Sequence, residues 1–434
     1  MFSSTIDMIA YLFVPQRDVD ISLSVMHHQK KTKPKERQMS KINVIREMRE
    51  LKTHLSYSKN IGFFFGAGSS CALGIPNVEQ LTSGIEAKLT GDFLNHFSLV
   101  KTDLETIITD RKVNIEDILN QIRRIRELTA ETAKIYEGVS GENAKGLDKE
   151  ICKTIYNIIL EKESTANIEK TKKFFAWLSL LNRDFSKEVF TTNYDLIIEK
   201  SLEGSQIPYF DGFVGSYEPF FWQESIDQFV TKNDLTQNWI RLWKIHGSLS
   251  WFWKEDATTN AQRIVRIGKI ENIEDEENEL VIYPSKEKYD SSKKQPFIAY
   301  FDRLKNYLLS GELLFVFTGY SFSDQHINEI IFNCLRQNNR LTALVFFFQD
   351  SEVESLHKQT SSYMNLNVFG PTKAIINGNL GEWEYTAGDL KPNEKSDSYW
   401  NSIDSKFKLG DFNELVNFFI ANSGKKEAIE SIVS

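Results

Sequence analysis

The chain has 434 residues, of which 41% are hydrophobic and 12% aromatic, so it can bury a large core in two or three structural units. Its net charge of −8 argues against the broad basic surface that neutralises nucleic-acid phosphates, and we expect no direct nucleic-acid binding. No apolar run approaches the ~20 residues of a membrane-spanning helix, so no membrane partner is expected. Cys71, Cys152 and Cys334 are far apart, which predicts buried thiols in a reducing cytoplasm rather than disulfides.

The first 38 residues differ in character from the rest of the chain. They end in a basic run at 27–37 and carry no signal-peptide pattern, so we expect residues 1–38 to be a disordered leader or to lie outside the natural reading frame. Met39 then opens a predicted amphipathic helix. Its apolar positions are Ile42, Val44, Ile45, Met48 and Leu51.

A short apolar run, Ile61-Gly62-Phe63-Phe64-Phe65, stops at the small residues Gly66-Ala67-Gly68-Ser69-Ser70. This pattern predicts a buried strand that feeds a phosphate-binding turn, because glycines let backbone N–H groups approach an anion closely. Taken alone, the same residues also fit an ordinary tight turn.

Long helical periodicities dominate residues 77–173. Their apolar positions include Leu104, Ile107, Ile108, Ile115, Ile118, Leu119, Ile122 and Ile125. We interpret this stretch as a helical insertion, with a break between two helices at residues 137–146, which are rich in glycine and polar residues. The insertion would divide a Rossmann-like domain into residues 39–76 and 174–390, followed by a C-terminal helical tail at 391–434.

Several later strands end at polar residues. Glu188–Phe190 leads into Thr191-Thr192-Asn193, and Arg241–Ile245 is ended by His246-Gly247. The continuous apolar runs Leu313–Phe317 and Leu341–Phe348 are typical of strands covered on both faces. Because strands alternate with helices, the sequence predicts an α/β fold with a doubly wound parallel sheet.

Smaller elements complete the prediction. Helices are expected at Leu196–Leu202, where Asp195 favours the start, and at Gln325–Leu335, where Asp324 is a candidate cap. Two strand-like runs, at 263–267 and 279–283, are separated by an acidic stretch that we interpret as an exposed hairpin loop. The tail from residue 402 to 433 predicts one or two helices, broken at Gly410.

Four segments, taken together and in this order, resemble the NAD-binding motifs of the sirtuin superfamily. They are Gly66-Ala67-Gly68-Ser69, Thr191-Thr192-Asn193-Tyr194-Asp195, Lys244-Ile245-His246-Gly247-Ser248 and Gly319-Tyr320-Ser321-Phe322-Ser323-Asp324. The resemblance is greatest to the bacterial sirtuin-like NAD hydrolases of antiphage defence. It implies that the first motif surrounds the NAD diphosphate, that Pro76 belongs to a mobile cofactor-binding loop, and that Gly319 and Ser321 contact the adenosine ribose and phosphate.

The resemblance also implies the chemistry. Asn193 would hold the nicotinamide-ribose hydroxyls or a water beneath the anomeric carbon, and an amide suits this role because it both donates and accepts hydrogen bonds. His246 would be the general base toward a ribose hydroxyl, since its ordinary pKa lies near neutrality. Asp195 would orient the nicotinamide half or the loop, unless it serves only as a helix cap. Thr192, which replaces a Gln of the family motif, would also face the cofactor.

The sequence departs from the family pattern in two places, in the cofactor-binding loop and in the missing zinc module, and the second decides the subclass. Asn77-Val78 follow Pro76, where sirtuin deacylases continue the loop toward Phe-Arg. Residues 247–312 contain no cysteine, so the four-cysteine zinc module of the deacylases is missing and we expect no zinc.

By resemblance, the chain is expected to be an NAD glycohydrolase that gives nicotinamide and ADP-ribose or a cyclic form. It would deplete NAD in antiphage defence as a homo-oligomer, often with a partner ATPase or Argonaute-like protein. The alternatives are a zinc-free protein deacylase or ADP-ribosyltransferase, and a non-catalytic sensor that binds NAD or ADP-ribose. The presence of Asn193 and His246 argues against a pure sensor.

Overall fold

The computed structural model describes residues 39–183, 185–226, 238–255, 262–268, 273, 278–282 and 295–434. The predicted leader, residues 1–38, lies outside the described residues. In the part of the chain that is described, no helix is both long enough and apolar enough to cross a membrane.

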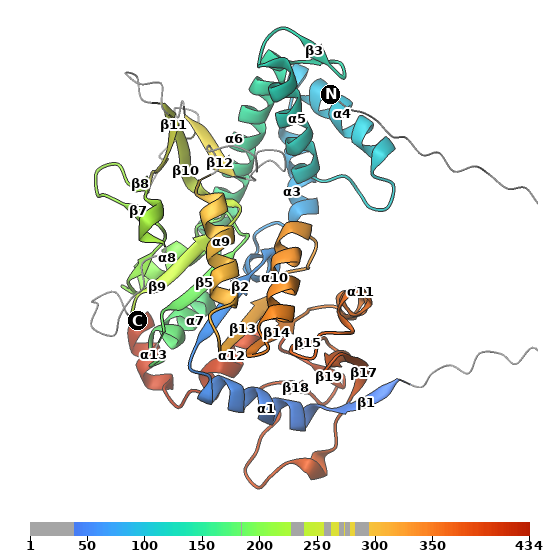
Figure 1. Ribbon diagram of the computed structural model, residues 1–434, viewed down its shortest axis with the longest axis vertical. Coiled ribbons are helices and arrows are strands. Elements are labelled where there is room, and N and C mark those ends of the chain that lie inside the picture. Colours follow the sequence, from blue (N-terminus) through green and yellow to red (C-terminus); the bar gives the residue numbers. More distant parts are fainter. Residues whose placement is uncertain are drawn as a thin grey trace, which may run out of the picture. The chain divides into compact units, whose positions relative to one another are not determined.

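A ten-stranded sheet organises the fold (Figure 1). Its order is β1 (Ser40–Asn43), β17 (Asn379–Glu384), β16 (Lys373–Ile376), β15 (Leu366–Phe369), β14 (Leu341–Phe346), β13 (Leu313–Thr318), β2 (Ile61–Phe65), β5 (Lys187–Thr191), β9 (Ile240–Lys244) and β6 (Tyr209–Phe210). The seven strands from β15 to β6 are parallel to their neighbours. Strands β16 and β17 add antiparallel pairs, and β1 pairs in parallel with β17. The predicted α/β fold with a parallel-dominated sheet is confirmed.

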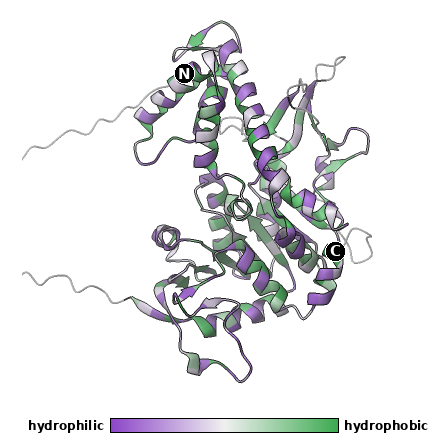
Figure 2. Ribbon diagram, turned by 180° about the vertical axis from the view of Figure 1, so that it is seen from behind, coloured by the Kyte–Doolittle hydropathy of each residue, from purple (hydrophilic) through white to green (hydrophobic). Residues whose placement is uncertain are grey.

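Strand β2 shows why the sheet is covered on both faces. Successive side chains of a strand point to opposite faces, so Phe63 and Phe65 pack into one core cluster and Phe64 into another. The first face carries α1 (Val44–Tyr57), α7 (Glu169–Ser179), α8 (Ile197–Gly204), α12 (Phe412–Ala421) and α13 (Lys426–Val433). The second carries α9 (Phe297–Leu308), α10 (Gln325–Gln337) and α11 (Asp350–Thr360). Figure 2 shows the hydrophobic residues gathered along the strands.

The helical insertion is made by α3 (Val78–Lys88), α4 (Gly91–Ile107), α5 (Ile115–Thr129) and α6 (Gly141–Thr165). It shares a third core cluster with an antiparallel sheet. That sheet has the order β12 (Glu279–Ile282), β10 (Gly247–Glu255), β11 (Gln262–Arg266), β8 (Phe220–Phe221) and β7 (Phe213–Val214). Buried Asp148 of α6 binds Arg123 and Arg126 of α5, and Arg126 also binds Glu279 of β12. These ion pairs tie the insertion to the antiparallel sheet.

Four details of the prediction were wrong. Ile42 lies in β1 rather than in a helix, because Asn43 caps α1 by accepting from the Arg46 amide at 3.0 Å. The break at 137–146 is shorter than expected, since α6 already begins at Gly141 and the break holds the hairpin of β3 (Ile135–Tyr136) and β4 (Val139–Ser140).

The strands predicted as a hairpin, β11 and β12, flank β10 on opposite sides and do not pair with each other. The acidic stretch between them lies mostly outside the described residues. The tail forms two helices, α12 and α13, but the part before Gly410 is a hairpin of β18 (Trp400–Asn401) and β19 (Lys406–Phe407) rather than a helix.

Candidate active site

A cavity of about 990 Å³ lies at the carboxyl ends of the parallel strands. Residues that come directly after β2, β5, β9, β13 and β14 line it. The chain proceeds from β2 through β5 to β9 on one side of β2 and then returns to β13 on the other side. In open α/β sheets, ligands bind in the crevice at this topological switch point.

Three glycines let the two loops at the switch point meet backbone to backbone. The Gly68 amide donates to the Gly319 carbonyl at 2.9 Å, and the Gly66 amide donates to the Thr318 carbonyl at 3.0 Å. A Cβ at Gly66 would lie 2.3 Å from the Gly319 oxygen, and a Cβ at Gly319 would lie 2.3 Å from the Ser69 nitrogen. Gly319 also has a φ of 66°, in the region that favours glycine. The glycines are therefore required for contact between the loops.

Three backbone amides of the glycine turn, those of Gly66, Gly68 and Ser69, already donate hydrogen bonds to backbone carbonyls of the protein. The Ser69 amide donates to the Gly66 carbonyl at 3.1 Å, in addition to the two bonds made by Gly66 and Gly68. The Ser69 hydroxyl also donates to the Gly66 carbonyl, at 2.8 Å. The expected set of free backbone donors for a diphosphate is thus smaller than the sequence pattern suggested.

Asn193 is held by the glycine turn. Its Nδ2 lies 3.1 Å from the Gly66 carbonyl, 3.1 Å from the Ser69 Oγ and 2.9 Å from the Ser70 Oγ. The Gly66 carbonyl can only accept, so the amide nitrogen must face it. The side-chain oxygen of Asn193 is then turned from the glycine turn and is the atom of this amide that can meet a ligand in the cavity.

Asp195 holds the Ser70 hydroxyl in the orientation that accepts a hydrogen bond from Asn193. Its Oδ2 accepts from the Ser70 hydroxyl at 2.7 Å, which leaves the Ser70 oxygen to accept from Asn193. Its Oδ1 accepts from the Ile197 amide at 3.2 Å near the start of α8. Buried Lys244 donates to the Asp195 carbonyl at 2.5 Å. Both expected roles of Asp195, in the site and at the helix start, are therefore compatible with its contacts.

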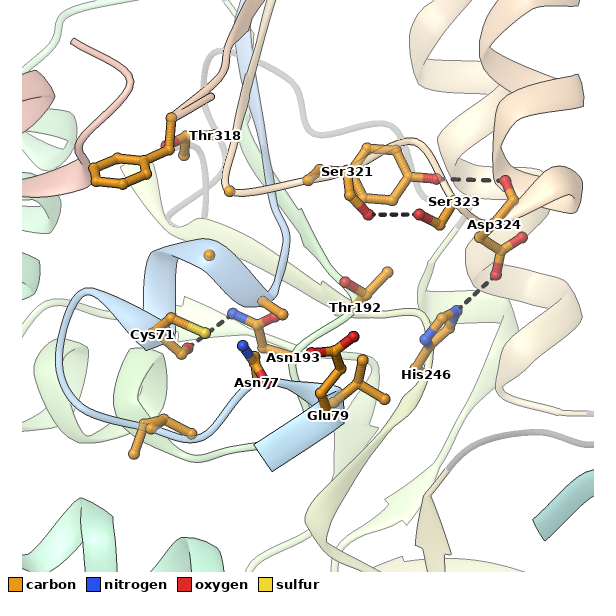
Figure 3. A pocket seen from close by; sticks show the side chains of 18 of the residues that line it. Cys71, Asn77, Glu79, Thr192, Asn193, His246, Thr318, Ser321, Ser323 and Asp324 are labelled. Atoms are coloured by element: carbon orange, nitrogen blue, oxygen red, sulfur yellow. Dashed lines mark hydrogen bonds and ion pairs between the residues drawn. The ribbon is translucent and has the colours of Figure 1, made fainter. Parts of the chain in front are cut away.

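His246 and Asp324, which both line the cavity, contact each other through their side chains (Figure 3). The His246 Nε2 lies 3.2 Å from the Asp324 Oδ2. Burial disfavours the charged imidazole, but the hydrogen bond to Asp324 and the charges of Glu116 and Asp324 raise the pKa of His246 above its ordinary 6.5. Burial likewise opposes the charged form of Asp324, yet the contact with His246 lowers the pKa of this carboxyl to about 2.

Residues of the helical insertion also line the cavity. Glu79 comes from the first turn of α3, and Glu116 and Asp117 come from the first turn of α5. The Asn114 side chain caps α5, accepting from the amides of Glu116 at 2.9 Å and Asp117 at 3.2 Å. Arg111 binds Asp117 through both of its terminal nitrogens, at 2.6 and 2.7 Å. The insertion is therefore part of the cavity and not only a remote helical domain.

Most predicted site residues line this one cavity. They are Ala67, Gly68, Pro76, Thr192, Asn193, Asp195, His246, Gly319 and Ser321. Gly66 and Ser69 are not on the lining and instead hold the turn and Asn193.

Sequence reasoning missed Ser70 as a link, Asp324 as the partner of His246, and the acidic residues of the insertion. A capping signal marked Asp324, but 78 residues separate it from His246 and no local pattern pairs them. Among the described residues, no cluster of histidine, cysteine and acidic side chains could hold a metal ion.

The fold and the site define a doubly wound α/β domain with a large cavity at its switch point. Comparison with protein families shows that residues 187–368, from β5 to β15, match the SIR2-like domain. The matched region includes Asn193, His246 and Asp324.

Solved structures of Sir2 homologues are similar to the chain at low identity. A Sir2 homologue in complex with NAD has 13% identity and a TM-score of 0.31, covering 71% of this chain and 84% of that one. A Sir2 homologue mutant in complex with ADP ribose has 15% identity and a TM-score of 0.34, covering 68% and 83%. Another mutant, in complex with 2'-O-acetyl ADP ribose, has 13% identity and a TM-score of 0.31, with the same coverage. The curated proteins gave no match.

Proposed function

We propose that this protein is an NAD glycohydrolase that cleaves the bond between nicotinamide and ribose. The observation that carries the proposal is the meeting of the Asn193 amide and the His246–Asp324 pair in one cavity at the switch point of a SIR2-like domain. A histidine whose pKa is raised by a neighbouring carboxylate is typical of sites where a proton is moved.

The cavity has the size and the donor set for a dinucleotide. Its volume of about 990 Å³ is at the upper end of the ~300–1,000 Å³ of small-molecule sites. Hydroxyls of Thr192, Ser321 and Ser323 line it and can donate to phosphate or ribose oxygens. Carboxylates of Glu79 and Glu116 suit the positive charge of the nicotinamide ring and of the ribosyl group as the bond breaks.

In the proposed reaction the nicotinamide-ribose bond breaks through an oxocarbenium-like state. The Asn193 oxygen accepts a hydrogen bond from a ribose hydroxyl or from the attacking water. His246 removes the proton of the water or hydroxyl that captures the anomeric carbon, and nicotinamide leaves with the bonding electron pair. Water capture gives ADP-ribose, and internal capture gives a cyclic product.

The chain segment after His246 bears on the alternatives of deacylation and ADP-ribosyl transfer. This segment forms β10 and its antiparallel sheet, which packs on the helical insertion. Carboxylates of Glu79, Glu116 and Asp117, the last paired with Arg111, line the cavity on the insertion side and suit a cationic nicotinamide ring better than a neutral acyl chain. For that reason we favour hydrolysis of free NAD.

The decisive experiment is incubation of purified protein with NAD, with chromatography of nicotinamide, ADP-ribose and cyclic products. We expect nicotinamide and an ADP-ribose product in equal amounts. Binding without turnover would support a sensor, and turnover only with an acylated peptide or a protein acceptor would support the deacylase or transferase.

The biological role comes from resemblance rather than from site chemistry. We propose that the enzyme depletes NAD in antiphage defence and is zinc-free, cytoplasmic and oligomeric, with activation by assembly or by a partner ATPase or Argonaute-like protein. Light scattering at micromolar concentration should show a species larger than one 50.2 kDa chain. A monomer with full, constitutive NAD cleavage would contradict control by assembly.

A further inference from the structure

The orientation of the His246 ring is set by an acceptor that is itself fixed. Asp324 is the N-cap residue of α10, and its Oδ1 accepts from the amides of His326 at 2.9 Å and Ile327 at 3.1 Å. With one oxygen held by the helix, the other, Oδ2, lies 3.2 Å from the His246 Nε2. The helix therefore aims the carboxylate at the imidazole.

An ionised carboxylate can only accept hydrogen bonds, and the low pKa of Asp324 keeps it ionised at neutral pH. The proton of the neutral imidazole must then be on Nε2, because only one ring nitrogen carries it. In Figure 3 the ring turns its other nitrogen toward the side of the cavity where Thr192, Asn193 and Glu79 lie. That nitrogen, Nδ1, is left with its lone pair directed into the cavity.

We propose that Asp324 is a positioning residue that fixes the tautomer of His246, so that Nδ1 is the basic atom of the site. This proposal deepens the proposed NAD hydrolysis and rests on it for its catalytic consequence. The proton from water or a ribose hydroxyl passes to Nδ1, and the imidazolium that forms is stabilised by the Asp324 carboxylate through Nε2–H.

Other titratable groups act on His246 by charge or line the same cavity. Glu116 of α5 acts on the imidazole through its charge. Glu79 of α3 and His326 of α10 line the same cavity. The contact with Asp324 is the one hydrogen bond of the His246 ring that the described structure specifies, so the tautomer depends on this carboxylate.

Two substitutions separate positioning from helix capping. Asn, Ser and Asp are all good N-cap residues, so Asp324→Asn and Asp324→Ser should both leave α10 intact. In Asp324→Asn, the oxygen is needed by the amides of His326 and Ile327, so the NH₂ group faces Nε2 and forces the proton onto Nδ1. In Asp324→Ser, the hydroxyl is too short to reach the ring, and either tautomer can form.

We expect Asp324→Asn to lower the kcat for nicotinamide release about 100-fold or more, the usual contribution of a general base. Asp324→Ser should lose activity by a smaller factor. A capping role alone predicts wild-type kcat for both variants, and that result would overturn the proposal.

A second readout does not depend on turnover. In protein labelled with ¹⁵N-histidine, the His246 ring signals are identified by their loss in His246→Gln. The wild type should show a protonated Nε2 and an unprotonated Nδ1, and Asp324→Asn should reverse them. A protonated Nδ1 in the wild type would refute the proposal. If the wild type cleaves no NAD, the proposed function fails while the spectra still decide the tautomer.

Discussion

Phe419 of α12 stacks face to face on Trp177 of α7, with ring centroids 4.5 Å apart and an angle of 5° between the planes. Both side chains are buried, and both also contact Phe63 on the central strand β2. Helix α12 is therefore packed into the same core as the central strand β2.

This contact predicts a large loss of stability for Phe419→Ala. Removing a buried aromatic ring costs ~3–5 kcal/mol because transfer free energy is lost and a cavity remains. Tyr217→Ala is the matched control, since Tyr217 is fully exposed and its removal should change the free energy of unfolding by less than ~0.5 kcal/mol. Urea denaturation measures both, and equal midpoints would contradict the packing described.

The second prediction concerns Asn193. Asn193→Ala should abolish nicotinamide release, because it removes the amide that the glycine turn holds at the cavity. Fold and assembly should persist, as judged by circular dichroism and light scattering. An unchanged rate would refute the proposed active site, whereas a variant that does not fold would mean that Asn193 has a structural role.

The third prediction tests the contact between the two loops. Gly319→Ala should impair NAD binding and stability together, because the new Cβ would lie 2.3 Å from the Ser69 nitrogen and φ is 66°. The expected cost is at least ~1–3 kcal/mol, the usual range for strained backbone. Gly388→Ala is the control, since a Cβ there meets nothing within 4 Å and φ is not positive. Calorimetric NAD binding and thermal unfolding report the two effects.

The fourth prediction is a pH dependence. A general base must be neutral, so kcat/KM should fall as the pH drops through the raised pKa of His246, with a midpoint above 6.5. Glu116 contributes to this increase through its negative charge, so Glu116→Gln should move the acidic limb to lower pH. Glu79→Gln, another acidic residue of the insertion wall, should leave the midpoint in place even where it changes the rate. A wild-type midpoint below 6.5 would be inconsistent with the ion-pair contact to Asp324.

The fifth prediction concerns metal. Nicotinamide release should survive exhaustive chelation, and purified protein should contain no stoichiometric zinc, because residues 247–312 offer no cysteine ligands. Zinc at one equivalent in elemental analysis would reopen the deacylase alternative.

The main strands and their polar ends could be predicted from the sequence. Runs such as Phe63-Phe64-Phe65 are apolar at every position because both faces of the central sheet are covered, and they stop where glycine or an amide begins the loop. The residues at these ends belong to one sheet edge, and Asn193 and His246 line one cavity there.

The remaining features depend on contacts that no local pattern encodes. Asp324 at the start of α10 meets His246 after β9 although 78 residues separate them, and Glu116 acts on His246 from the helical insertion. The strands β11 and β12 looked like a hairpin because they are consecutive and flanked by polar residues. In the sheet, the longer strand β10 lies between them and forms antiparallel pairs with both β11 and β12.

The pairing of β1 with β17 has a consequence for synthesis of the protein in the cell. Lys41 binds Glu382 across this strand pair, and 341 residues separate them. At the ~5–20 residues per second of translation, β17 leaves the ribosome about 20 to 70 s after β1. During that time β1 has no strand to pair with and α1 lacks much of its core. Residues 40–57 therefore stay without these strand and core partners until residues 379–384 have been made.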